Sequence, residues 1–259
     1  MGPMKLGVIT THHPVSTDQG EAWLPGAYRG GAEMSDAEYL EMAPEDVEWC
    51  YTTPEDAAAF DRILVTSIDH LQPAECDYLA ALEPVVFLHH EVAGLPHRRT
   101  LLEAARCVML HTPAHEQRTT AWCEPRRVEL VLSAIEVPEL PTLEVREWVA
   151  LAACRNHPLK GIKNARVWAA RNRMPLEVMT NAPRGEVLDR MREVETFVHL
   201  PLAFESEGRA VMEAVLSGCQ VVTNDLAGIT SVPDWDVADV LRARIAAAPG
   251  SYWGAVCNP

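Results

Sequence analysis

FESEGRAVMEAVLSGCQVVTND, residues 204–225, is the most informative stretch of this sequence. Its first acid, Glu205, precedes a glycine, and its second acid, Glu213, stands among apolar residues at helical spacing. A further glycine ends this helical run, a strand-like segment follows at 220–223, and Asp225 comes directly after it. This order is typical of a helix and the following strand in a parallel α/β sheet, with Glu205 in a loop and Glu213 about two turns into the helix.

The residues around this stretch continue the alternation of strands and helices through the second half of the chain. We expect strands at 148–153, 176–179, 196–200 and 220–223, and helices at 161–170, 185–192, 209–217 and 237–247. Strands that alternate with helices pair in parallel through crossover connections. The second half is therefore predicted to be a doubly wound α/β domain.

The first half of the chain has the same pattern. We expect strands at 5–10, 47–51, 62–66, 84–89, 106–110 and 128–132, and helices at 32–42, 74–82, 98–105 and 114–123. Residues 134–144 carry two prolines among acidic residues and are interpreted as a linker. The prediction is two Rossmann-like domains, 1–137 and 145–259, with a ligand in the cleft between them at the carboxyl ends of the strands.

Composition excludes several classes of protein. A chain of 259 residues that is 48% apolar has enough material for real cores. Its net charge of -15 argues against a generic polyanion binder, because such binding needs an excess of cations. The seven cysteines are scattered without a CxxC pair, so we expect reduced thiols in a cytoplasmic protein, and no apolar run is long enough to cross a membrane.

Residues 205–213 resemble the E-x7-E signature of glycosyltransferase family 4 and its relatives. The resemblance implies a retaining GT-B glycosyltransferase that moves a sugar from a nucleotide-diphosphate sugar to an acceptor. Glu213 would accept hydrogen bonds from the ribose hydroxyls, and Glu205 would face the transferred sugar. Gly208 and Arg209 at the start of the helix would lie beside the diphosphate, where backbone N–H groups favour an anion.

A second match lies at residues 154–161, CRNHPLKG, which resemble the Arg-x4-Lys-Gly element of the same family. Arg155 and Lys160 would neutralise the diphosphate as the glycosidic bond breaks, a role that a metal ion fills elsewhere. The resemblance therefore implies a metal-independent enzyme without a resident cofactor, and we expect a UDP or GDP sugar as donor. Cys154 stands where the family usually has glycine.

Two matches fall in the first domain. Gly30 and Gly31 resemble a Gly-Gly-Ala-Glu turn before the first helix, where backbone N–H groups approach a ligand closely. The segment 84–91, PVVFLHHE, resembles a strand whose final histidine faces the donor sugar. His90 fits this position better than His89, but the choice between the two histidines stays open. Residues 12–28 are an insertion that would form part of the acceptor site or a lid. His111 and His115 lack the order of a zincin, so no metal site is expected.

Departures from the family pattern keep two alternatives open. Glu207 replaces the usual aromatic residue and would repel a diphosphate unless it points away or pairs with Arg209. Residues 227–231 also lack the acid that often follows the later glycine pair in this family. The first alternative is a catalytically weak nucleotide-sugar-binding protein of the same fold, and the second is a GT-B-shaped sugar-nucleotide epimerase. A dehydrogenase is disfavoured because no G-x-G-x-x-G follows the first strand.

The acceptor and the assembly are not specified by these motifs. The acceptor would be a small molecule or lipid, a protein hydroxyl, or a modified DNA base, and a mild excess of arginines within residues 91–127 would suit a phosphate-bearing one. In many relatives a C-terminal helix crosses back onto the first domain. The helix expected at 237–247 leaves little sequence for that, so we expect the domains to close through a homodimer or through ligand.

Overall fold

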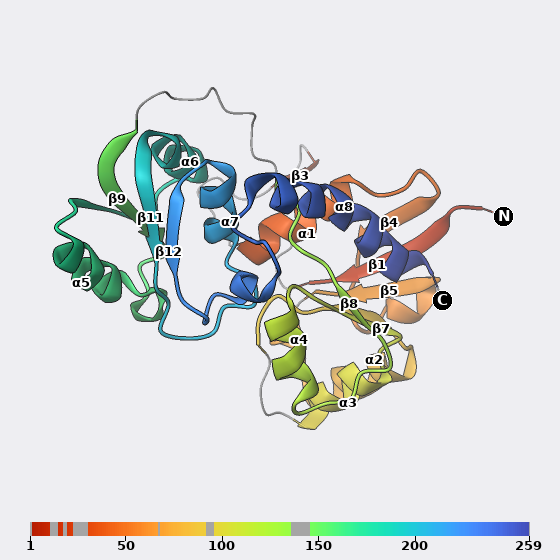
Figure 1. Ribbon diagram of the computed structural model, residues 1–259. Coiled ribbons are helices and arrows are strands. Elements are labelled where there is room, and N and C mark those ends of the chain that lie inside the picture. The colour runs from red at the N-terminus through yellow and green to blue at the C-terminus, as the bar shows by residue number, and fades with distance from the viewer. Residues whose placement is uncertain are drawn as a thin grey trace. The chain divides into compact units, whose positions relative to one another are not determined.

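The computed structural model describes residues 2–10, 15–17, 20–22, 31–66, 68–91, 96–135 and 146–258, with the backbone alone at 15–17, 20–22 and 31–34. The chain divides into two compact units. Unit 1 comprises Met1–His111, Glu116–Ala134 and Ala247–Pro259, and unit 2 comprises Thr112–His115 and Ile135–Ala246. Each unit has its own parallel sheet (Figure 1). Among the described residues no helix is both long and apolar enough to cross a membrane.

Unit 1 is built on a six-stranded sheet in the order β4-β1-β5-β6-β7-β8, in which every neighbouring pair is parallel. Its strands are β1 (Met4–Ile9), β4 (Val47–Tyr51), β5 (Arg62–Val65), β6 (Val85–Phe87), β7 (Cys107–Leu110) and β8 (Val128–Leu130). The interior strands β6 and β7 are buried at every residue, as expected for parallel strands with helices on both faces. The six predicted strands are confirmed.

Helices cover both faces of this sheet. They are α1 (Gly31–Glu41), α2 (Pro73–Ala81), α3 (Pro96–Ala104) and α4 (Pro113–Thr120), with a short 3-10 turn η1 (Ala57–Ala59). Tyr39 of α1 packs in one core layer with Phe87, whereas Leu79 of α2 and Leu101 of α3 pack in the opposite layer. Proline begins α2, α3 and α4, at a position where its missing N–H costs no helical hydrogen bond. The predicted helices are confirmed.

The C-terminal helix α8 (Ala238–Cys257) corrects the sequence prediction. The prediction ended this helix at 247, before Pro249 and Gly250, but the helix continues through both. Tyr252 is fully buried and stacks on Tyr39 of α1, with ring centroids 4.1 Å apart. Burial of this apolar surface outweighs the poor helix propensity of proline and glycine.

Two expectations are therefore wrong. Enough sequence remains for the C-terminal helix to reach the first domain, because residues Ala247–Pro259 belong to unit 1. The predicted second domain, 145–259, is accordingly too long at its C-terminal end. Trp253 and Val256 join the same buried cluster of unit 1 as Tyr252, which explains why this segment leaves unit 2.

Unit 2 is built on a four-stranded sheet in the order β10-β9-β11-β12, again parallel throughout. Its strands are β9 (Glu147–Cys154), β10 (Leu176–Thr180), β11 (Val194–His199) and β12 (Gln220–Thr223), and its other elements are η2 (Pro158–Lys160), α5 (Ile162–Asn172), α6 (Arg184–Glu193), α7 (Arg209–Leu216) and η3 (Gly228–Ser231). Figure 1 shows α5 on one side of this sheet and α7 on the other. The first strand, β9, lies beside the third, β11, so the strand order reverses there, and such a switch point is where doubly wound sheets bind ligands.

Parts of the predicted insertion and linker lie outside the described residues. Within the insertion, β2 (Val15–Thr17) pairs with β3 (Gly20–Ala22) in antiparallel fashion. Residues 136–145 of the linker and Gly30 of the predicted glycine turn lie outside the described residues. Gly31 is the first residue of α1.

Candidate functional site

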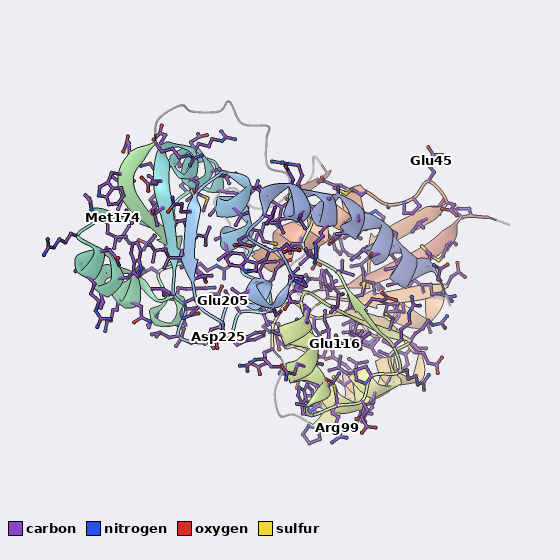
Figure 2. All side chains as sticks on the ribbon, in the orientation of Figure 1. Glu45, Arg99, Glu116, Met174, Glu205 and Asp225 are labelled. Atoms are coloured by element: carbon purple, nitrogen blue, oxygen red, sulfur yellow. The ribbon has the colours of Figure 1, made fainter. Side chains whose placement is uncertain are left out.

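Polar side chains gather at the carboxyl ends of β9 and β11, the switch point of unit 2. Strand β9 ends at Cys154 and leads through Arg155 into the turn η2, which carries Lys160. Strand β11 ends at His199 and leads into the loop that carries Glu205. Figure 2 shows Glu205 at the end of the sheet where these strands finish.

The carboxylate of Glu205 is held at both oxygens. Lys160 Nζ donates to Oε1 at 3.0 Å, and His199 Nε2 donates to Oε2 at 2.9 Å. The side chain of Glu205 is 16% exposed and that of His199 is 5% exposed. Burial by itself would raise the pKa of Glu205, but the hydrogen bond and charge of His199, together with the charge of Lys160, lower it to about 2. The carboxylate is therefore ionised and fixed in orientation.

A close backbone approach at Gly161 brings Lys160 to Glu205. Gly161 has φ of 78°, in the left-handed region, and a Cβ atom there would overlap the carbonyl oxygen of Leu200. The loops after β9 and β11 are further joined by a hydrogen bond from the N–H of Leu202 to the carbonyl of Leu159, at 2.8 Å. Glycine is required here because any side chain would separate the two loops.

The Glu205 loop is also tied to the loop after β12. The N–H of Glu205 donates to the carbonyl of Leu226 at 2.8 Å, and the N–H of Gly228 donates to the carbonyl of Glu205 at 2.8 Å. The N–H of Ile229 donates to the carbonyl of Glu207 at 2.7 Å, and Glu207 itself is buried. The backbone that carries the first acid is thus pinned on both sides.

The second acid lies inside α7 and is paired with arginines. Gly208, with φ of 93°, is the N-cap of this helix and caps it without a side-chain hydrogen bond. Arg184 Nε donates to Glu213 Oε1 at 2.8 Å, and Arg209 Nε approaches the same oxygen at 3.4 Å. The Glu213 side chain is 8% exposed. Its buried charge is therefore compensated by two guanidinium groups.

Five of the predicted site residues thus form two clusters in unit 2. Lys160 lies with Glu205, and Arg209 lies with Glu213 behind the left-handed Gly208. Arg155, also predicted, is exposed directly after β9. The contacts show which of these residues meet; what they bind remains a prediction.

In unit 1 the two adjacent histidines differ sharply. His90 is exposed after β6, whereas His89 is buried. His89 Nε2 lies 2.8 Å from Asp36 Oδ1, and its Nδ1 lies 3.2 Å from His111 Nε2. His111 Nδ1 lies 3.1 Å from the carbonyl oxygen of Val131, which can only accept, so this nitrogen carries a proton. His89 therefore belongs to a buried hydrogen-bond network, and His90 is the histidine of the pair that faces solvent.

No group of three or more His, Cys, Asp or Glu side chains among the described residues is arranged to hold a metal ion. His111 is hydrogen-bonded to His89, and His115 lies buried in α4.

Sequence reasoning missed His199 and Arg184. A signal for His199 was present, since it stands near the carboxyl end of a predicted strand, where ligand-binding side chains of α/β sheets gather. No signal existed for Arg184, because its partner Glu213 is 29 residues away and the contact depends on how α6 packs beside α7.

Two parallel-sheet α/β units of this topology define the GT-B fold, as predicted. No protein-family model and no curated protein matches the sequence. Among solved structures, HepE of Anabaena in complex with UDP has 13% sequence identity and a TM-score of 0.57, covering 98% of this chain and 95% of that chain. AviGT4, a glycosyltransferase involved in avilamycin A biosynthesis, has 15% identity and a TM-score of 0.51, covering 98% and 92%. An alpha-glucosyltransferase in complex with UDP-glucose and DNA containing an abasic site has 11% identity and a TM-score of 0.51, also covering 98% and 92%.

Proposed function

We propose that this protein is a retaining glycosyltransferase that moves a sugar from a nucleotide-diphosphate sugar to an acceptor hydroxyl. The observation that carries the proposal is the pairing of Glu205 with Lys160 and of Glu213 with Arg209 at one end of the unit 2 sheet. These are the residues of the E-x7-E and Arg-x4-Lys-Gly resemblances. The GT-B fold supports the proposal, as do the UDP and UDP-glucose complexes of HepE and the alpha-glucosyltransferase.

The donor would bind across the start of α7. A diphosphate suits the N-terminus of this helix, because helix N-termini favour anions and no side chain caps this one at the left-handed Gly208. Glu213 lies one to two turns further on and would accept hydrogen bonds from the vicinal ribose hydroxyls, as a carboxylate with two acceptor oxygens can. Arg184 and Arg209 offset the cost of burying its charge.

Cationic groups near the leaving group would carry the chemistry. As the bond from the sugar C1 to the phosphate oxygen breaks, negative charge grows on the diphosphate, and Lys160, Arg155 and the α7 N–H groups would stabilise it. The acceptor oxygen would bond to C1 on the same face and pass its proton to the departing phosphate oxygen. This scheme needs neither a covalent nucleophile nor a metal ion. Glu205, ionised, would accept hydrogen bonds from the sugar hydroxyls.

Unit 1 would supply the acceptor side, with the exposed His90 as its candidate contact. The acceptor would be a small molecule or lipid, a protein hydroxyl, or a modified DNA base. The DNA complex of the alpha-glucosyltransferase is a reason to test DNA early. Binding to DNA should weaken steeply as salt rises, and a flat salt response would remove that acceptor.

We also propose a cytoplasmic location, supported by seven cysteines that are all free. The sequence also allows a homodimer, and the mass of the protein in solution would test this oligomeric state.

A thermal-shift screen tests the donor site. UDP, GDP, ADP and TDP and their common sugar conjugates are each added with and without EDTA. A ligand at 100 times its Kd stabilises the native state by about 2.7 kcal/mol. We expect one nucleotide to stabilise the protein regardless of EDTA. The variants Lys160→Met and Glu213→Gln should abolish this thermal shift. The control variant Lys163→Met, which removes an exposed lysine of α5, should preserve it.

A transfer assay separates the proposal from its alternatives. Product with the donor's anomeric configuration, read by NMR, supports a retaining transferase. Tight binding without transfer to any acceptor class favours the catalytically weak binding protein, whose motivation is the buried Glu207. Release of an epimerised sugar favours the epimerase. Absence of binding by every nucleotide would overturn the site model.

A further inference from the structure

His199 provides the second contact of Glu205 and belongs to neither the E-x7-E nor the Arg-x4-Lys-Gly resemblance. It is the last residue of β11 and donates from Nε2 to Glu205 Oε2 at 2.9 Å. Its side chain is 5% exposed, so the interaction takes place in a largely water-free setting. A charge-assisted hydrogen bond of this kind is strong and directional.

The two partners of Glu205 differ in how firmly they are held. His199 lies on a central strand, and its ring is nearly parallel to that of Phe197, with an interplanar angle of 11°. Lys160 lies on the short turn η2, and its side chain is 34% exposed. A lysine ammonium has three donors on a flexible stem and can turn to a new acceptor, whereas a buried imidazole cannot.

The proposed donor would compete for Lys160. A diphosphate carries more negative charge than one carboxylate, so the ammonium of Lys160 would turn toward it and loosen its contact with Oε1 of Glu205. Glu205 would then depend on Oε2. A buried carboxylate without any partner costs free energy, so without the contact at Oε2 the side chain of Glu205 would leave its position.

We propose that His199 is a positioning residue. Its Nε2–H fixes the Glu205 carboxylate while Lys160 serves the diphosphate, so that Glu205 stays aimed at the sugar hydroxyls. This inference rests on the proposed function and adds to it a residue that would act through Glu205. It predicts that His199 matters for the sugar and for turnover, and that it does not matter for the nucleotide.

Two variants separate this role from simple packing. His199→Phe keeps a ring beside Phe197 and removes the donor. His199→Gln places an amide N–H near the position of Nε2 and keeps the donor. His70→Phe, at an exposed histidine of unit 1, is the matched control. Thermal unfolding of each variant checks that the protein is folded.

The readouts are calorimetric affinities for UDP against UDP-glucose, and for GDP against GDP-mannose, together with the rate of nucleotide release from the sugar conjugate. For His199→Phe we expect unchanged nucleotide affinity, weaker sugar-conjugate affinity, and a kcat lower by about 10- to 100-fold, which is the size of effect that loss of an orienting outer-shell partner has at metal sites. His199→Gln should recover most of both losses.

The outcomes distinguish this inference from the function on which it rests. Wild-type protein that binds and turns over a nucleotide sugar, with His199→Phe equal to it, overturns the positioning role alone. Equal loss of nucleotide and sugar-conjugate affinity, or no recovery in His199→Gln, also overturns the positioning role, because either result means that His199 acts through packing. Wild-type protein that binds none of these probes overturns the proposed function and this inference with it.

Discussion

Arg184 and Glu213 are joined by a hydrogen bond of 2.8 Å, from Nε to Oε1, although 29 residues separate them along the chain. The contact connects the first residue of α6 to the interior of α7. Glu213 is buried, so its carboxylate needs this partner, and Arg209 at 3.4 Å compensates it less well.

We expect Arg184→Met to lower the free energy of unfolding by about 1–3 kcal/mol, because it removes the closer partner of a buried charge. Urea denaturation measures this. The same variant should weaken nucleotide binding if Glu213 contacts the ribose.

A double-mutant cycle with Glu213→Gln identifies the source of that loss. Arg184→Met in the Glu213→Gln background should cost clearly less than it does alone, because the charge that it neutralised is gone. Arg171→Met, at an exposed arginine on α5, is the control for loss of an arginine. Additive losses would mean that Arg184 acts elsewhere.

Glu205 makes the stability of the folded protein depend on pH in the acidic range. Its pKa is lowered from 4.5 to about 2 in the folded protein, so its stabilising contribution is complete above about pH 4.5 and is lost as the pH falls toward 2. Each unit of pKa difference corresponds to about 1.4 kcal/mol, which gives a contribution of the order of 3 kcal/mol. The gap in unfolding free energy between wild type and Glu205→Gln should therefore shrink across this range, as urea titrations at several pH values would measure. A gap independent of pH would contradict the ionised state.

Gly161→Ala should be strongly destabilising. The φ of 78° disfavours any side chain, and the new Cβ would overlap the Leu200 carbonyl, so we expect a loss above about 2 kcal/mol together with loss of the Lys160–Glu205 contact. Gly185→Ala is the matched control, since nothing lies within 4 Å of its added Cβ and alanine favours the helix. Thermal unfolding of both variants measures the contrast. Equal stability of the two would show that the loops can separate without cost.

Tyr252→Ala should destabilise unit 1 by about 3–5 kcal/mol, as removal of a buried aromatic side chain does. Tyr252 is fully buried and stacks on Tyr39. Tyr78→Ala, in which the tyrosine is 41% exposed on α2, is the control and should cost far less. Chemical denaturation followed by tryptophan fluorescence would measure both. A small loss for Tyr252→Ala would mean that the end of α8 is dispensable.

Much of the fold was predictable because its signals are local. The buried strands such as β7 are short apolar runs, and three of the helices between strands, α2, α3 and α4, begin at proline. The first and second acids of residues 204–225 were likewise assigned correctly to a loop and to a helix. Parallel pairing then follows from the alternation itself.

The exception was α8, where the local signal was misleading. Pro249 and Gly250 disfavour a helix within their own few residues, and a prediction limited to that window ends there. The helix continues because Tyr252, Trp253 and Val256 find a hydrophobic core more than 100 residues away in sequence. Long-range burial is worth more than local propensity.

The sequence by itself determined which residues carry charge at the ends of the strands and where each stands on its own element. Only the tertiary structure decided which of these residues meet: Lys160 with Glu205, His199 with Glu205, and Arg184 with Glu213. The physical reason is that helix and strand periodicity depend on neighbours a few residues apart. Hydrogen bonds and ion pairs across the site depend instead on the register of parallel strands and on the close approach of loops, which no local pattern encodes.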